Sequence, residues 1–212
     1  MNLRDHMIRY APITCFLGAA TVLTVPQAMA AGVPANAESV SGTVGTAKPL
    51  GALGPLTHLV IQRILVSDDV AASKFGTGSP VEDPVREAQV LEQVRTRAEA
   101  SGVDPETAVA FFQDQITASK VVQQGLFARW TAHPREAPTT PPDLGPTRER
   151  LDQLTTALLQ ELKDTEHLRD ELVACTVQLA VATGSGTALE GLDTLHRQAL
   201  AVATGSVCRH GQ

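Results

Sequence analysis

Hydrophobic residues recur at a helical period along most of the chain after residue 50. The first periodic stretch starts near Leu53 and ends at the glycine-containing segment 75–79. Its apolar positions are spaced three or four residues apart, as on the buried face of an α-helix; they are Leu56, Leu59, Val60, Ile64, Val66 and Val70. The pattern predicts a helix over about residues 53–74.

The helices that follow are predicted from the residues at their ends. Ser79, Pro80 and Glu82 have the order of a capping box with proline at the first helical position, so a second helix is predicted to begin at Pro80. The remaining boundaries are Gly102 just past the second helix, Asp104 as the N-cap of a third, Pro134 at the end of the third, and 144–146 at the start of a fourth.

The last third of the chain predicts two more helical stretches, over about 166–182 and 190–206. The glycine-rich segment 184–186 is expected to form the turn between them. No strand pattern and no internal repeat are visible in the sequence. We therefore predict an all-α fold, a single-domain bundle of about six helices over residues 51–212.

The N-terminus has the pattern of a secretory signal peptide. Arg4 and Arg9 precede an apolar stretch over 13–25, and Ala28 and Ala30 supply small residues for cleavage after Ala30. The alternative is an uncleaved membrane anchor, for which the apolar run is short. Residues 31–50, rich in small residues and proline, are expected to be a flexible leader. No later segment resembles a membrane span, so an exported protein is expected, periplasmic or secreted, without a membrane contact in its mature form.

Composition and cysteine content narrow the function further. The net charge of −6 argues against a nucleic-acid binder, which would normally be basic. Cleavage of the signal peptide leaves Cys175 and Cys208, and an even pair in an oxidising compartment favours a disulfide. The alternative is a metal site with a histidine, but the spacings to His167, His196 and His210 match no standard zinc pattern. No metal is expected.

Several cations fall on helical faces that also carry apolar residues. Arg63 and Lys74 are eleven positions apart, close to three turns, so both point the same way at about 16 Å along the helix axis. They could close on a small anion between them. Arg148 precedes Leu151 by three residues and is expected on the apolar stripe of the fourth helix.

Further polar residues accompany these cations. Asp83, Arg86 and Glu87 stand at the start of the second helix, and Ser119 and Gln123 are four apart in line with the apolar stripe of the third. A single such arginine usually extends to solvent, and a buried Ser or Gln usually bonds backbone or water. Several cations on buried faces, however, would cost several kcal/mol to desolvate unless a bound dianion offset their charge. The sequence offers no nucleophile–base pair and no glycine-rich phosphate loop.

The order and spacing of these residues resemble the secreted chorismate mutases, the exported subclass of the all-α chorismate mutase family. The resemblance covers about residues 52–210. It rests on Arg63, Lys74, Arg86, the segment Phe112-Gln113-Asp114-Gln115-Ile116, Ser119, Gln123, the segment Pro141-Pro142-Asp143-Leu144, Arg148 and the pair Cys175 and Cys208.

The resemblance implies an isomerase that rearranges chorismate to prephenate without a cofactor, within a homodimer whose chains each hold a complete site. It implies that Lys74 and Gln123 donate to the ether oxygen of the substrate. By the same resemblance Arg63 and Arg148 hold carboxylate, Ser119 assists, and Arg86 serves a carboxylate or the ether region. Asp83 is counted among the substrate-binding residues, and Glu87 is a plausible acceptor for the substrate hydroxyl.

Two other interpretations use the same residues. A non-catalytic periplasmic helical module could bind a small dicarboxylate with the same cations. A structural bundle without a ligand would leave the arginines exposed.

Overall fold

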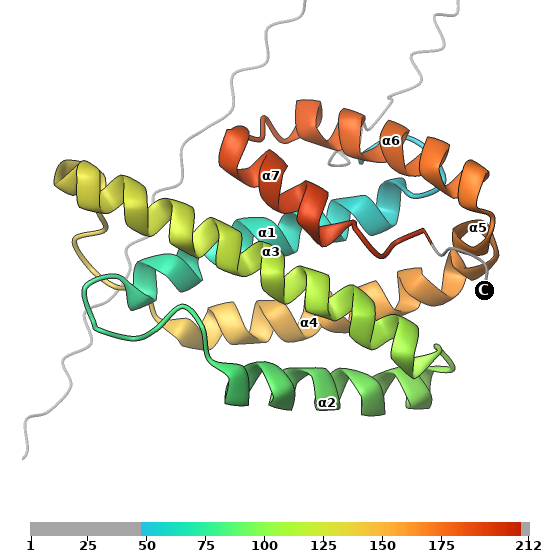
Figure 1. The fold of residues 1–212 in the computed structure, drawn as a ribbon, viewed down its shortest axis with the longest axis horizontal. Coiled ribbons are helices and arrows are strands. Elements are labelled where there is room, and N and C mark those ends of the chain that lie inside the picture. Colours follow the sequence, from blue (N-terminus) through green and yellow to red (C-terminus); the bar gives the residue numbers. More distant parts are fainter. Residues whose placement is uncertain (1–47, 209–212) are drawn as a thin grey trace, which may run out of the picture. The chain divides into compact units, whose positions relative to one another are not determined.

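Helix α1, Gly54–Lys74, runs through the bundle and contacts α3, α4, α6 and α7 (Figure 1). The computed structural model describes residues 48–208, in which seven α-helices and one 3-10 turn are present and no strand occurs. The other elements are α2 Pro84–Ser101, α3 Pro105–Ala132, the 3-10 turn η1 Pro134–Glu136, α4 Leu144–Asp164, α5 Glu166–Asp170, α6 Leu172–Leu189 and α7 Thr194–Ala203. The all-α prediction is confirmed.

The core lies where α1 meets α3 and α4. Those three helices supply many of its fully buried apolar side chains: Leu56, Val60, Ile61, Ile64, Phe111, Phe112, Leu158 and Leu162. Helix α2 packs against α3 on one side of the bundle, and α6 and α7 lie on the opposite side (Figure 1). The site described below lies among helices α1 to α4.

Several of the predicted helix ends are confirmed, including the end of α3 at Ala132, just before Pro134. Gly102 follows α2 in the left-handed conformation, with φ of 71°, which glycine adopts without steric cost. Asp104 caps α3 by accepting from the Thr107 backbone N–H at 2.8 Å. Helix α4 begins at Leu144, capped by Asp143.

The predicted start of the second helix is wrong. Helix α2 begins at Pro84, and its N-cap is Asp83, which accepts from the Arg86 N–H at 3.0 Å. A helix from Pro80 would place Pro84 in its interior, where the proline ring clashes with the carbonyl four residues before it. Residues 75–83 therefore form a loop, which turns at Gly76 and Gly78, both with positive φ.

The predicted turn at 184–186 is also wrong, because this segment lies inside α6. Gly186 serves close packing, because an added Cβ there would lie 2.7 Å from Ile61 Cδ1 of α1, whereas a Cβ on Gly184 would meet nothing within 4 Å. The chain instead turns at 190–193, where Gly191 has a φ of 60° and Asp193 caps α7. The stretch predicted as one helix from 166 is divided between α5 and α6 at Glu171.

Both ends of the described chain are fixed to α6. Pro49 is buried and the Leu50 N–H donates to Ser185 Oγ at 2.8 Å, so residues 48–50 belong to the packed unit rather than to the leader. The predicted disulfide between Cys175 and Cys208 is present. Several predictions fall outside the described residues. These are the predicted signal peptide at 1–30, residues 31–47 of the predicted leader, and His210 within 209–212.

Helix α6 is more apolar than the sequence analysis recognised. It is 18 residues long with a mean hydropathy of 1.5, enough by length and composition alone to cross a membrane. One of its faces packs on the bundle through Cys175, Ala182 and Gly186, while only 17% of the helix is buried. Val173 and Val177 on the other face are exposed.

Candidate active site

Two adjoining cavities lie among α1, α2, α3 and α4. The first has a volume of about 170 Å³ and collects seven of the eight predicted site residues: Arg63, Lys74, Asp83, Arg86, Glu87, Ser119 and Gln123. The second, also about 170 Å³, is lined by Arg148 and Arg97. Both cavities share Arg63, Arg86, Val90 and Leu151. Four arginines thus line the second cavity, two of them shared with the first.

Arg63 lies where the two cavities meet. Its guanidinium stands 5.5 Å from the ring centre of Phe112, and Nη1 donates to Leu151 O at 3.4 Å and to Thr155 Oγ1 at 3.3 Å. Both hydrogen bonds are longer than usual. Burial lowers the pKa of Arg63 to about 10, and the carboxylate of Asp152 opposes the shift. A half-buried cation with long hydrogen bonds is well suited to receive a carboxylate ligand.

Lys74, the last residue of α1, also lines the first cavity. Its Nζ donates to Pro80 O at 3.1 Å and to Val81 O at 3.4 Å, both in the loop that precedes α2. Burial lowers the pKa of Lys74, while Asp83 and Glu87 act in the opposite direction. The loop carbonyls hold the ammonium at the cavity wall and leave donor capacity for a ligand.

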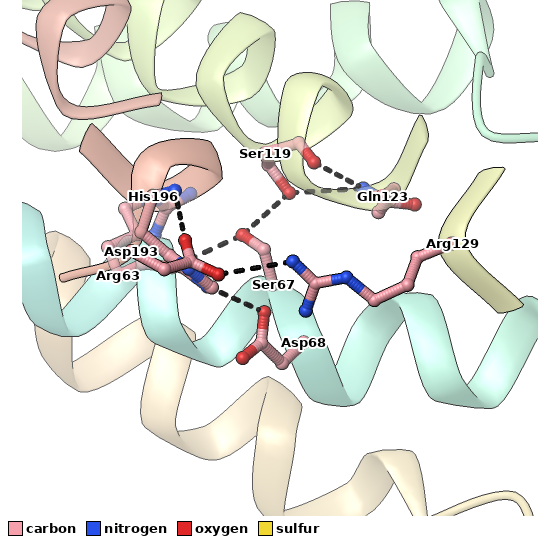
Figure 2. Close-up of polar contacts among 8 residues, drawn as sticks. All are labelled: Arg63, Ser67, Asp68, Ser119, Gln123, Arg129, Asp193 and His196. Atoms are coloured by element: carbon pink, nitrogen blue, oxygen red, sulfur yellow. Dashed lines mark hydrogen bonds and ion pairs between the residues drawn. The ribbon is translucent and has the colours of Figure 1, made fainter. Parts of the chain in front are cut away.

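Ser119 and Gln123 on α3 face α1 across the first cavity. Gln123 is buried, and its Nε2 donates to Ser119 Oγ at 3.1 Å and to Ser119 O at 3.3 Å. Ser119 Oγ in turn accepts from Ser67 Oγ at 2.9 Å (Figure 2). The amide of Gln123 is therefore anchored to Ser119 through its nitrogen, and its Oε1 is buried with no hydrogen-bond partner among the described residues.

Glu87 lines the first cavity but is already engaged. Its carboxylate accepts from Lys120 Nζ at 3.0 and 3.2 Å, which joins α2 to α3. The pair is half-buried on both sides. Asp83 is exposed and caps α2, so it holds the helix that presents Arg86.

Arg148 is exposed. It precedes the buried residues Thr155 and Leu159 by seven and eleven positions, so it shares their face of α4. It lies in the first turns of the helix, which begins at Leu144. Arg148 therefore reaches the second cavity from its edge, and Arg86 is likewise exposed.

Sequence reasoning missed several polar residues of the cavities: Ser67, Gln115, Lys120, Arg97, Asp152 and Thr155. The spacing of Ser67, four residues after Arg63, could have placed it on the same face of the helix. Lys120 and Asp152 gave no such signal, because their importance comes from ion pairs with residues of other helices. Among the described residues no group of three or more His, Cys, Asp or Glu could hold a metal ion.

The chain is similar to known proteins. Residues 55–124 match the family described as chorismate mutase type II. A secreted chorismate mutase of Mycolicibacterium smegmatis is 35% identical over 164 residues, which cover 77% of this chain and 90% of that protein. The chain belongs to the chorismate mutase family.

Solved structures agree with this assignment. The crystal structure of chorismate mutase from Burkholderia phymatum aligns with a TM-score of 0.71 at 37% identity, over 75% of this chain and 97% of that one. A secreted chorismate mutase of Mycobacterium tuberculosis is 32% identical over 74% of this chain and 78% of that protein. As a chorismate mutase the protein is an enzyme, an isomerase. The type II match includes seven of the eight predicted site residues, whereas Arg148 lies beyond it.

Proposed function

We propose that the mature chain, exported to the periplasm or secreted, rearranges chorismate to prephenate in the two adjoining cavities. The observation that carries the proposal is the convergence of Arg63, Lys74 and Gln123 on one cavity whose neighbour is lined by Arg148. These residues come from three helices and are 85 positions apart at the extremes, 63 and 148.

The reaction is a unimolecular rearrangement in which one C–O bond breaks as one C–C bond forms. No proton is transferred, so acid–base catalysis is not required. The substrate is a dicarboxylate whose reactive chair conformer is a minority in water. Arg63, Arg86 and Arg148 bind its two carboxylates and hold that conformer, which removes most of the orientational cost before the bonds change.

Lys74 and Gln123 supply the second contribution. As the ether bond breaks, its oxygen gains negative charge, and hydrogen bonds from the ammonium and the amide then strengthen. Interactions that are stronger in the transition state than in the ground state are those that raise kcat. A rate gain of about 10⁶ requires roughly 8 kcal/mol, shared between orientation and this stabilisation.

The direct test is an absorbance assay of chorismate loss and prephenate formation with the chain from Ala31 onward. We expect turnover in the presence of a chelator. Binding of chorismate without turnover would instead support the non-catalytic dicarboxylate-binding module. Absence of both would contradict either proposal.

We also propose that the enzyme is a homodimer, assembled through the outer face of α6. Val173, Val177 and Val181 lie four residues apart on this face and are 79%, 56% and 44% exposed. No charged residue occurs from Leu172 to Leu189, so two negatively charged chains can meet there without like-charge contacts.

Light scattering of the wild type and of Val177→Glu tests the dimer. A wild-type dimer that becomes monomeric in the variant supports the interface. A monomeric wild type would contradict it, and a wild-type monomer that binds lipid vesicles would assign the face to a membrane surface. Because no cavity residue lies on α6, activity should survive in the variant.

A further inference from the structure

Ser67 is a buried hydroxyl of α1 that faces α3 at the wall of the first cavity. It is 3% exposed and lies one turn after Arg63. Its Oγ is 2.9 Å from Ser119 Oγ and 3.3 Å from the Arg63 carbonyl of its own helix. Hydroxyl hydrogen bonds are normally 2.5–3.0 Å long, so the Ser67 proton is donated to Ser119.

Ser119 Oγ accepts a second hydrogen bond, from Gln123 Nε2 at 3.1 Å. A hydroxyl has two acceptor lone pairs and one proton. Both lone pairs of Ser119 are occupied, by Ser67 from α1 and by Gln123 from its own helix (Figure 2). Within residues 48–208 no hydrogen bond donated by the Ser119 hydroxyl is present. All three side chains line the first cavity, so that proton is available to a ligand there.

We propose that Ser67 is a positioning residue: its donation to Ser119 Oγ turns the Ser119 O–H toward the cavity, where it donates to a substrate carboxylate. The inference deepens the proposed function and rests on the contact between Ser119 and the substrate. Ser67 itself does not touch the substrate. Because Ser67 donates to it, the Ser119 hydroxyl presents its proton, and not a lone pair, to an anion in the cavity.

The proposal also explains why a serine is useful at this place on α1. Hydrogen bonds in a chain polarise one another, so a hydroxyl that accepts two bonds becomes a better donor. A carboxylate ligand would complete the chain Ser67 to Ser119 to anion. Without the Ser67 hydroxyl, the Ser119 O–H can rotate toward the vacated side, and turning it back on binding lowers substrate affinity.

The test is a double-mutant cycle in KM and kcat with Ser67→Ala, Ser119→Ala and the double variant. We expect Ser67→Ala to raise KM about threefold to tenfold and to leave kcat within about twofold. Ser119→Ala should raise KM by more, because it removes a hydrogen bond to a charged group. In the Ser119→Ala background, Ser67→Ala should have no further effect on KM.

Ser73→Ala is the matched control. Ser73 is also on α1 and donates back to Val70 O at 2.8 Å, but it lines neither cavity, so its KM should equal that of the wild type. A full effect of Ser67→Ala in the Ser119→Ala background would overturn the relay, since a general loosening of α1 does not need Ser119. If Ser67→Ala left KM unchanged while Ser119→Ala raised it, the role of Ser67 would be overturned and the contact between Ser119 and the substrate would stand. An unchanged KM in Ser119→Ala would overturn both the contact and the role of Ser67.

Discussion

At the scale of single residues, the chemistry of the site depends on which groups stay neutral. Gln123 is an amide, buried beside Ser119 and on the same cavity as Lys74. An amide donates a hydrogen bond at any ordinary pH. The wild-type rate should therefore be nearly flat across the neutral range.

Gln123→Glu turns this donor into a titrating group. A carboxyl group can donate to the ether oxygen only when protonated, and when ionised it opposes the charge that develops there. Activity of the variant should be present at acid pH and fall as pH rises through the pKa of the new carboxyl. The measurement is a pH–rate profile of both proteins, with Gln124→Glu as control, because Gln124 is exposed on the next position of α3. A Gln123→Glu profile that follows the wild type from pH 4 to 8 would exclude Gln123 as the donor.

Arg148 tests the second cavity. It is exposed and has no ion-pair partner within residues 48–208, so its removal should leave the free energy of unfolding within about 0.5 kcal/mol. The loss of a hydrogen bond to a carboxylate should lower kcat/KM by about 10- to 100-fold in Arg148→Ala. Arg150→Ala, also exposed on α4 but outside both cavities, is the control. Equal kcat/KM in both variants would show that substrate does not reach the second cavity.

The sequence predicted the chemistry of the site better than its contacts. Spacing along α1 and α3 was enough to place Arg63, Lys74, Ser119 and Gln123 on inward faces, because a helical period fixes direction locally. It could not show that Lys120 of α3 neutralises Glu87 of α2, since that pair depends on how two helices dock. Spacing also could not show that Arg148 is exposed, because Arg148 shares a face of α4 with the buried residues Thr155 and Leu159.

At the scale of elements, the predicted helix ends were confirmed where the sequence held one signal. They were wrong where two signals competed. Asp104 and Gly102 stand alone, and both behave as predicted. Residues 79–84 hold two prolines and two possible caps, and the second proline decides because it cannot enter a helix that starts at the first. Gly186 appeared to be a turn residue, but it serves the close approach of α6 to α1.

A charged cluster ties three helices together beside the site. His196 of α7 contacts Asp193 through Nδ1 at 2.7 Å and Asp68 of α1 through Nε2 at 3.0 Å, and Asp193 also accepts from Arg129 of α3 (Figure 2). The hydrogen bond to Asp68, with that to Asp193, raises the pKa of His196 to about 9. Burial alone would raise the pKa of Asp193, but the hydrogen bonds from His196 and Arg129 lower it to about 2.

These pKa shifts predict how stability depends on pH. The stabilisation from charged His196 is fully present below its unfolded pKa, about 6.5, and is lost as pH rises through about 9. Since Asp68 and Asp193 are 44% and 42% exposed, solvent screening limits it to roughly 1–2 kcal/mol. Urea unfolding of wild type and His196→Gln between pH 5 and 10 measures it. The free energy of unfolding of the wild type should exceed that of the variant most below pH 6.5, and the difference should shrink at higher pH. A constant difference over the whole range would contradict the ionised cluster.

At the scale of the whole molecule, the site and the disulfide lie in different parts of the bundle. Cys175 and Cys208 join α6 to the segment after α7, 33 residues later, whereas α6 and α7 supply none of the cavity residues. Loss of the disulfide should therefore lower the stability of the protein without lowering its catalytic activity.

Reduction of the disulfide tests that separation. A bond of this kind typically contributes about 2–4 kcal/mol, so reduction should lower Tm by several degrees while kcat at moderate temperature is retained. Thermal unfolding and activity of the reduced, alkylated protein provide the measurement, with thiol titration of the denatured, unreduced chain expected to show no free thiol. Loss of activity in a sample that remains folded would mean that α6 and α7 control the cavity.

In the proposed mechanism Lys74 stabilises the negative charge that develops on the ether oxygen. The most direct measurement is kcat and KM for Lys74→Ala, with Lys163→Ala, whose ammonium bonds Ser101 O away from the cavities, as control. Because the partner charge of Lys74 exists only in the transition state, kcat should fall about 10²- to 10³-fold while KM changes little. A kcat near that of the wild type would contradict the account.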